Sequence, residues 1–140
     1  MVHVASFTIL NFLEECANAM SIRLNSAQNL ATPLKSKYLI QELKTLNLSD
    51  NDVHAIPPAL SSLSQLVELN LSKNVLLEIP DTVKQLKHLA VLDASVNPLQ
   101  KIPEGCTQLL SITELYLNDT FLEFLPANFG RLSKLRDPIQ

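Results

Sequence analysis

Apolar residues recur along this chain at a fixed interval of 23 residues. The stretch 43–51 reads L-K-T-L-N-L-S-D-N, and matching stretches begin at Leu66, Leu89 and Ile112. Apolar and polar residues alternate at the centre of each stretch, which predicts a short strand with one buried face. An apolar residue followed by proline comes at the same distance after each stretch, at 56–57, 79–80, 102–103 and 125–126. We therefore expect one structural unit to be repeated four times.

The pattern L-x-x-L-x-L-x-x-N at this period is typical of the leucine-rich repeat. It predicts an α/β solenoid, in which a curved right-handed coil carries a parallel β-sheet on its concave face. Short helical, 3-10 or extended segments are expected on the convex face. Burying one leucine side chain contributes about 1.5–3 kcal/mol, and a single unit cannot cover its own leucines. The units must therefore stack.

Residues that share a place in the four units are expected to form continuous buried columns. The strand columns are Leu46, Leu69, Leu92 and Leu115, and then Leu48, Leu71, Ala94 and Leu117. The remaining columns are Val53, Leu76, Leu99 and Leu122; Leu60, Val83, Cys106 and Phe129; and Leu63, Leu86, Leu109 and Leu132.

The repeat pattern divides the chain into three parts. Residues 1–18 do not fit the repeat, and the spacing of Phe7, Leu10 and Leu13 predicts a helical cap or an irregular segment. Residues 19–134 hold the repeats, of which 19–42 is degenerate and 43–65, 66–88, 89–111 and 112–134 are complete. Residues 135–140 form the truncated start of a further repeat, which suggests a fragment or a short isoform of a longer scaffold. A last coil that is covered by a partner is the alternative.

An asparagine ends the motif in three of the four complete units, at Asn51, Asn74 and Asn97. A tight bend leaves backbone polar groups that need partners, and a buried amide has both donors and an acceptor. We expect each asparagine to bond its own bend and that of the next unit. Thr120 takes this place in the fourth unit, and its smaller hydroxyl predicts a local irregularity.

Residues that flank the buried strand leucines are expected to face the concave surface, because side chains alternate along a strand. This face includes Ser49, Ser72 and Ser95, and it carries more acids than bases. The sequence therefore predicts a partner-binding stripe formed by Asp50, Glu68, Asn70, Asp93, Glu114, Tyr116 and Asp119. Proteins with a basic or mixed-charge surface are the expected partners.

Charge and cysteine content narrow the possible surroundings of the protein. The formal net charge is −3, so a nucleic-acid partner has no electrostatic support. No apolar run approaches the roughly 18 residues that span a bilayer, so membrane association is expected to be peripheral only. The two cysteines, Cys16 and Cys106, are too few for the disulfide-bonded caps of secreted repeats, which favours a reducing compartment. The sequence 17–19, A-N-A, keeps a secretory signal peptide open as the alternative.

No residue constellation in the sequence predicts catalysis, a cofactor, a metal site or a small-molecule substrate. His3, His54 and His88 are scattered, and no Cys/His spacing matches a zinc site. A chain with two glycines has no glycine-rich phosphate loop. Cys106 falls in a core column and is expected to be buried, whereas for Cys16 both a plain cap residue and an acylation site stay open.

The second half of the chain resembles a known family. The runs 94–98 (A-S-V-N-P), 108–110 (Q-L-L), 115–119 (L-Y-L-N-D) and 121–132 (F-L-E-F-L-P-A-N-F-G-R-L) are similar to the early repeats of the LAP proteins. These are scaffolds with leucine-rich repeats and PDZ domains, such as erbin, densin and Scribble. The resemblance covers about residues 43–135, and no PDZ domain is present in this chain.

The resemblance implies a non-enzymatic, intracellular protein-interaction module of a scaffold in cell polarity and junctional signalling. It implies a cytoplasmic location, with peripheral placement at the basolateral membrane or cell junctions. A cytoplasmic regulator of small-GTPase or phosphatase signalling is the first alternative. A secreted recognition protein is the second, and it rests on residues 17–19 and on the N-x-[ST] sequences at Asn47, Asn70 and Asn118.

Overall fold

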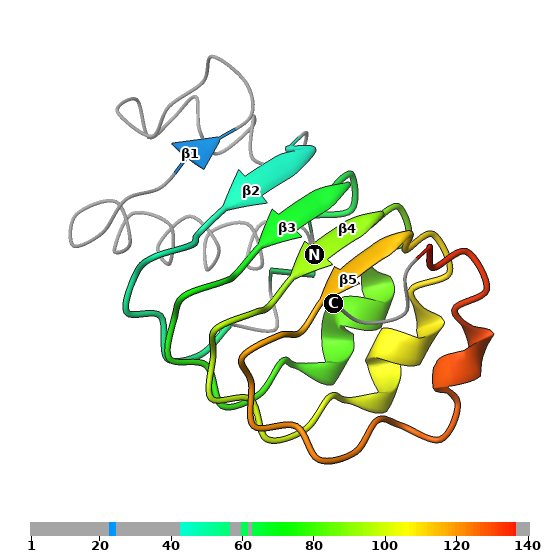
Figure 1. Cartoon of the computed structure of the whole chain (residues 1–140). Coiled ribbons are helices and arrows are strands. Elements are labelled where there is room, and N and C mark those ends of the chain that lie inside the picture. The colour runs from blue at the N-terminus through cyan, green and yellow to red at the C-terminus, as the bar shows by residue number, and fades with distance from the viewer. Residues whose placement is uncertain (1–22, 25–42, 57–59, 62, 137–140) are drawn as a thin grey trace.

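A computed structural model describes residues 23–24, 43–56, 60–61 and 63–136 of the chain. The predicted helix in residues 1–18, most of the degenerate repeat and Cys16 lie outside the described residues. Within them, successive coils stack side by side, with a sheet along one side and short 3-10 helices along the other (Figure 1). This is the solenoid that the 23-residue period predicts.

The sheet has the strand order β1-β2-β3-β4-β5. Its parallel part comprises β2 (Thr45–Asn47), β3 (Glu68–Asn70), β4 (Val91–Asp93) and β5 (Glu114–Tyr116). Each strand pairs with the residues 23 positions later, so that Leu46, Leu69, Leu92 and Leu115 stand in one row. The convex side carries the 3-10 helices η3 (Asp81–Gln85), η4 (Glu104–Gln108) and η5 (Phe129–Arg131).

The remaining strand, β1 (Arg23–Leu24), departs from the expected repeat. It runs antiparallel to β2 and places Leu24 opposite Leu46, where a repeat would place its residues in parallel register. The offset of 24 residues in the degenerate repeat predicts that Leu24 takes the place of Leu48, and its pairing with Leu46 shows that this prediction is wrong.

The apolar columns form one continuous core. The strand leucines Leu46, Leu69 and Leu92 are at most 1% exposed, and the five predicted columns are buried except at Leu122 and Phe129. These two residues belong to the last described coil and pack only partly against the core. Burial therefore depends on the neighbouring coil, as stacking requires.

The prolines mark the corner between the extended segment and the convex 3-10 helix. Pro80 and Pro103 precede η3 and η4 with φ of −67° and −72° and an extended ψ. Proline fixes φ near this value and donates no backbone hydrogen bond. The ring therefore sets the direction of the chain at the corner without leaving an unpaired N–H group.

Each buried asparagine joins two coils, but the second coil is the preceding one and not the next. The Asn97 Nδ2 donates to the carbonyls of Ala94 and Ser95 in its own coil and to that of Leu71 in the coil before. Its Oδ1 accepts the backbone N–H of Leu76 at 3.0 Å. Asn74 repeats the whole arrangement one coil earlier.

Thr120 breaks this arrangement. Its hydroxyl donates to the Leu117 carbonyl at 2.9 Å, which keeps one bond within its own coil. The side chain makes no bond to the preceding coil, and the N–H of Leu99 has no partner among the residues that the structure describes. The expected irregularity is therefore one missing connection between the last two described coils.

Candidate functional site

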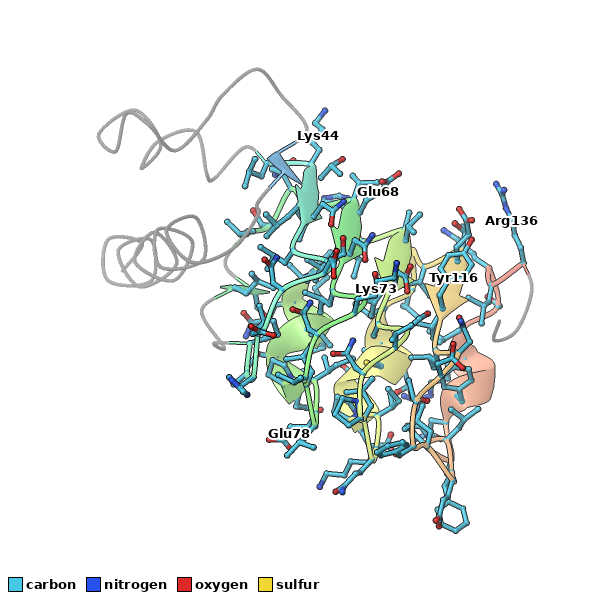
Figure 2. All side chains as sticks on the ribbon, turned by 60° about the vertical axis from the view of Figure 1, so that its left-hand side comes forward. Lys44, Glu68, Lys73, Glu78, Tyr116 and Arg136 are labelled. Carbon is cyan, nitrogen blue, oxygen red and sulfur yellow. The ribbon has the colours of Figure 1, made fainter. Side chains whose placement is uncertain are left out.

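The first row of the candidate site crosses three strands. Glu68 of β3 pairs in register with Val91 of β4, which pairs with Glu114 of β5. Neighbouring strands lie about 4.8 Å apart, so the two glutamates stand about 10 Å from each other across Val91. This distance is close to the Debye length at 0.1 M salt, so salt weakens the electrostatic interaction between the two side chains. Figure 2 shows Glu68 beside the strand that carries it.

The second row consists of Asn70, Asp93 and Tyr116. Asn70 and Asp93 already bond to other residues of the chain. The Asn70 Oδ1 accepts hydrogen bonds from the N–H and hydroxyl of Ser72, at 3.0 and 2.7 Å. A carboxylate oxygen of Asp93 accepts the N–H of Ser95 at 3.0 Å. Both side chains thus hold the turn that follows their own strand. At these two positions, the side chains of the predicted stripe therefore also stabilise the fold.

Tyr116 completes the second row, and it is tied to the first. Its hydroxyl donates to the Glu114 Oε1 at 2.6 Å. This bond fixes the end of the Tyr116 side chain beside Glu114, and Figure 2 shows Tyr116 at β5. A half-buried aromatic ring with a fixed polar tip is a suitable anchor for a protein partner.

A row of serines differs from its predicted role. Ser49, Ser72 and Ser95 were expected to face the concave surface, yet they are 8%, 8% and 5% exposed. Their hydroxyls bond to asparagine side chains, as in the 2.8 Å bond from Ser95 to Asn118. These residues therefore support the turns and do not form a contact surface.

The last predicted row lies in the turns after the strands. Asp50, Lys73, Val96 and Asp119 share this place, with φ of 60°, 57°, 54° and 57°. All four side chains are exposed. Lys73 takes this turn position in the coil next to that of Asp50. Its positive charge therefore lies between Asp50 and Asp119 in the row of turns. The structure thus brings Glu68, Asn70, Asp93, Glu114 and Tyr116 together, and leaves Asp50 and Asp119 at the two ends of the turn row.

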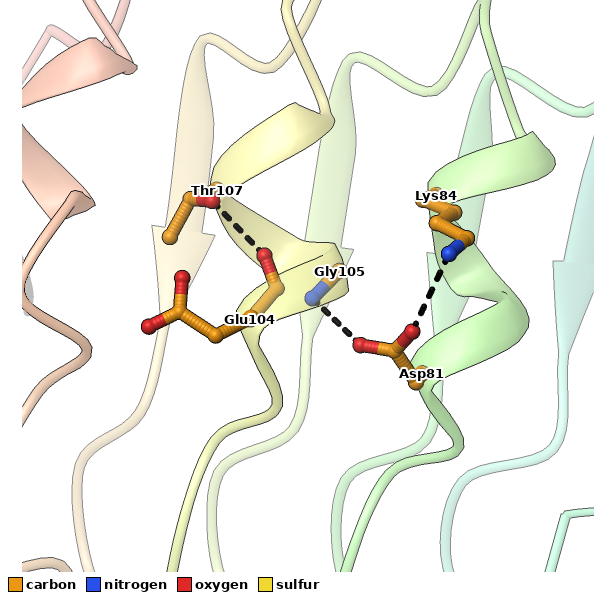
Figure 3. Close-up of polar contacts among 5 residues, drawn as sticks. All are labelled: Asp81, Lys84, Glu104, Gly105 and Thr107. Atoms are coloured by element: carbon orange, nitrogen blue, oxygen red, sulfur yellow. Dashed lines mark hydrogen bonds and ion pairs between the residues drawn. The ribbon is translucent and has the colours of Figure 1, made fainter.

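The convex side holds its coils together with a close polar contact. The Gly105 N–H donates to the Asp81 Oδ1 at 2.6 Å, and Lys84 lies 3.3 Å from the other carboxylate oxygen of Asp81 (Figure 3). A Cβ on residue 105 would lie 2.1 Å from the backbone carbonyl oxygen of Asp81. The absence of a side chain at Gly105 therefore allows η3 and η4 to approach each other.

Cys106 lies beside this contact and is inert. It is 1% exposed, and burial raises the pKa of its thiol to about 12, with a further contribution from the Asp81 carboxylate. The thiolate is the reactive form of cysteine. Because the folded-state pKa is raised, the thiol stabilises the fold fully below the pKa of the unfolded chain, and this contribution is lost as the pH rises toward 12.

A thiol-labelling experiment tests this description of Cys106. In a Cys16→Ser variant, we expect no reaction of Cys106 with an aromatic disulfide reagent at pH 8 in buffer. Reaction is expected to begin at the urea concentration where circular dichroism reports unfolding. Complete labelling in buffer within minutes would contradict the burial of Cys106.

The described residues contain no group of three or more His, Cys, Asp or Glu that could hold a metal ion. No helix in this part of the chain is long and apolar enough to cross a membrane. His54 lines an open hollow of about 540 Å³ with Leu77 and Gln100 of the next two coils.

The sequence prediction did not identify three large apolar residues that the structure leaves exposed. Leu77, Phe121 and Phe124 are 55%, 67% and 80% exposed. They lie between the asparagine or threonine and the proline of their units. The place of Leu77 is polar in the other three complete units, whereas the place of Phe121 is taken by Asp52, Val75 and Pro98. A large apolar residue at such a position is the signal that could have identified them.

Comparison with known proteins agrees with this geometry. The family pattern described as "Leucine rich repeat" matches residues 41–99. The fold is that of a leucine-rich repeat protein. Such folds serve in general as protein-interaction modules. No curated protein gives a match.

Solved leucine-rich repeat structures resemble the chain over about two thirds of its length. A repeat protein of Leptospira interrogans is 32% identical, with a TM-score of 0.66, over 69% of this chain and 26% of its own. The plant peptide hormone receptor RGFR1, solved with RGF2, is 36% identical, with a TM-score of 0.64, over 71% of this chain and 16% of its own.

A third match is the ectodomain of the Arabidopsis thaliana receptor kinase GASSHO1/SCHENGEN3, solved with CASPARIAN STRIP INTEGRITY FACTOR 2. It is 30% identical, with a TM-score of 0.60, over 68% of this chain and 12% of its own. The chain therefore spans about a quarter or less of these proteins.

Proposed function

We propose that this leucine-rich repeat protein binds a protein partner through its concave sheet. The observation that carries the proposal is the row formed by Glu68, Val91 and Glu114, with Tyr116 fixed beside it at 2.6 Å from Glu114. Two carboxylates about 10 Å apart with an apolar residue between them suit a surface with basic and apolar side chains. Such a charge arrangement steers a complementary partner.

The similar receptors support a polypeptide as the ligand. RGFR1 was solved with the peptide RGF2, and GASSHO1/SCHENGEN3 was solved with CASPARIAN STRIP INTEGRITY FACTOR 2. Extended solenoid surfaces bind partners across several repeats. The two rows of this chain likewise span β3 to β5.

We further propose that the chain serves in an intracellular scaffold of cell polarity and junctional signalling. The support is the resemblance of residues 94–132 to the early repeats of LAP proteins. A tagged chain in polarised epithelial cells is then expected in the cytoplasm and at the basolateral membrane. An exclusively secreted product would contradict this location and would favour the second candidate, a secreted recognition protein, to which the similarity with a receptor ectodomain points.

A matched pair of charge-reversal variants tests the concave surface. The first variant replaces Glu68 and Glu114 by lysine, and it leaves Asp93 in place because that carboxylate holds the turn at Ser95. We expect it to lose bound proteins that wild-type chain retains from a cell extract. Those proteins should also bind wild type more weakly as salt rises, because exposed charges are screened.

The control variant replaces Glu78 and Glu104 by lysine. Both residues are exposed and lie away from the concave sheet, so the control has the same change in net charge. Retention of every partner by the control and loss by the first variant is the expected outcome. Equal binding to both variants would remove the concave face from the proposal.

A further inference from the structure

Two valines on the concave side belong to one inner coil, residues 89–111. Val91 lies between Glu68 and Glu114 in the first row of the sheet. Val96 follows in the turn after the same strand. Strand β4 has β3 on one side and β5 on the other (Figure 1), so described coils flank both valines. Together, Val91 and Val96 form what we call the valine track.

Val96 is an apolar residue in a row of charged ones. It is 42% exposed, whereas Asp50, Lys73 and Asp119 take this turn position in the other coils. Its φ is 54°, a left-handed conformation that is strained for a β-branched side chain. Aspartate and asparagine adopt this conformation more readily. Neither burial nor backbone preference therefore accounts for a valine here, whereas a contact with a partner does.

Backbone hydrogen bonds hold Val96 in this conformation. Its N–H donates to the Asn118 carbonyl of the next coil at 2.9 Å, and the Lys73 N–H donates to the Ser95 carbonyl at 3.0 Å. Strained backbone persists only where the surrounding structure maintains it, and such residues are frequent in binding sites. The exposed side chain of Val96 is therefore held ready for contact, which lowers the entropic cost of binding.

The charges beside the valine track differ between its two ends. The glutamates of the first row flank Val91 with two carboxylates. At Val96, the flanking groups are the ammonium of Lys73 and the carboxylate of Asp119. Neither of these two groups forms an ion pair within the part of the chain that the structure describes. The charges at the Val96 end thus cancel, so a complementary ligand carries its basic groups at the Val91 end.

The spacing of the two valines fits an extended polypeptide. Five residues of extended chain span at most about 17 Å, and the turn before Val96 shortens this distance. In an extended partner, residues i and i+4 point to the same side and lie about 13 Å apart. One partner strand can therefore place an apolar side chain on each valine.

We infer that the partner segment is an extended polypeptide that lies along the coil 89–111. It places two apolar side chains, about four residues apart, on Val91 and Val96, and it carries lysine or arginine next to the one on Val91. This inference rests on the proposed binding through the concave sheet, and it adds Val96 as a residue that determines which segments bind.

Random dodecapeptides displayed on phage test this inference on the full chain. We expect the wild-type chain to enrich sequences with two apolar residues about four positions apart and with lysine or arginine beside one of them. Val96→Asn is expected to lose the preference for the other apolar residue. It should also bind a synthetic peptide from the wild-type selection at least about tenfold more weakly. The control is Leu77→Asn, at an exposed apolar residue outside the valine track, which should bind this peptide as the wild type does.

Urea unfolding separates a binding role of Val96 from a structural one. Asparagine adopts a positive φ more readily than valine, so Val96→Asn is expected to raise the midpoint of unfolding while it weakens binding. A lowered midpoint would show that Val96 serves the fold, and it would overturn the inference.

The inference and the proposed function fail in different ways. Unchanged peptide selection by Val96→Asn would overturn the valine track alone, provided that the double variant Glu68→Lys, Glu114→Lys loses the basic residues from its selected peptides. Selection of the wild-type sequences by this double variant would instead remove the concave sheet as the binding site. A wild-type selection without any shared sequence pattern would overturn the extended segment.

Discussion

Replacing Asn97 by alanine is expected to lower the free energy of unfolding by about 3–5 kcal/mol. The side chain donates to the carbonyls of Leu71, Ala94 and Ser95, and it accepts the N–H of Leu76. Asn97 is 3% exposed, so water cannot replace these bonds in the folded state. A buried donor left without a partner costs about 1–3 kcal/mol, and a hydrogen bond contributes about 0.5–1.5 kcal/mol.

Urea unfolding of the whole chain, followed by circular dichroism, measures this change. Thr120→Asn is the matched variant in the opposite direction, because an amide there can accept the N–H of Leu99. It is expected to raise the free energy of unfolding by about 1–2 kcal/mol. If Asn97→Ala and Thr120→Asn both left the midpoint of unfolding unchanged, the asparagine column would not join the coils.

Replacing Gly105 by alanine is expected to cost about 2–3 kcal/mol. The new Cβ would lie 2.1 Å from the Asp81 carbonyl oxygen, which belongs to the backbone and cannot turn aside. The helices η3 and η4 would have to separate, and the 2.6 Å bond from Gly105 to Asp81 would lengthen. The close contact between η3 and η4 on the convex side would thus be lost.

The control for Gly105 is the other glycine of the chain. Gly130→Ala adds a methyl group where nothing lies within 4 Å, and it removes conformational freedom from the unfolded chain. It is therefore expected to be neutral or to stabilise the fold by up to about 1 kcal/mol. The same urea experiment measures both variants. Equal effects of the two substitutions would show that residue 105 is not in close contact with Asp81.

The core could be predicted from the sequence because one rule fixes it at every repeat. Leu46, Leu69 and Leu92 recur every 23 residues, and a residue at that spacing must fall at the same point of the next coil. The role of Thr120 was predictable for the same reason, since a break in a regular column is visible without a structure. The sequence could not predict that Asn97 bonds to the preceding coil. The spacing alone does not tell which neighbouring coil the amide contacts.

The candidate site could be predicted only in part. Alternation along the strand placed Glu68 and Glu114 on the concave face, where the structure has them. It also placed Ser72 there, but the bond of its hydroxyl to Asn70 draws this side chain inward to 8% exposure. Such local side-chain bonds compete with simple alternation. The antiparallel pairing of β1 was likewise beyond the repeat pattern, because residues 19–42 keep only part of it.

The most direct test of a concave partner site is photo-crosslinking from two single positions. A photoreactive phenylalanine analogue at Tyr116 on β5 and another at Gln85 on η3 compare the concave and convex faces of the same coil stack. We expect Tyr116 to give a crosslinked protein in cells and Gln85 to give none. A crosslink from Gln85 in the absence of one from Tyr116 would contradict binding through the concave sheet.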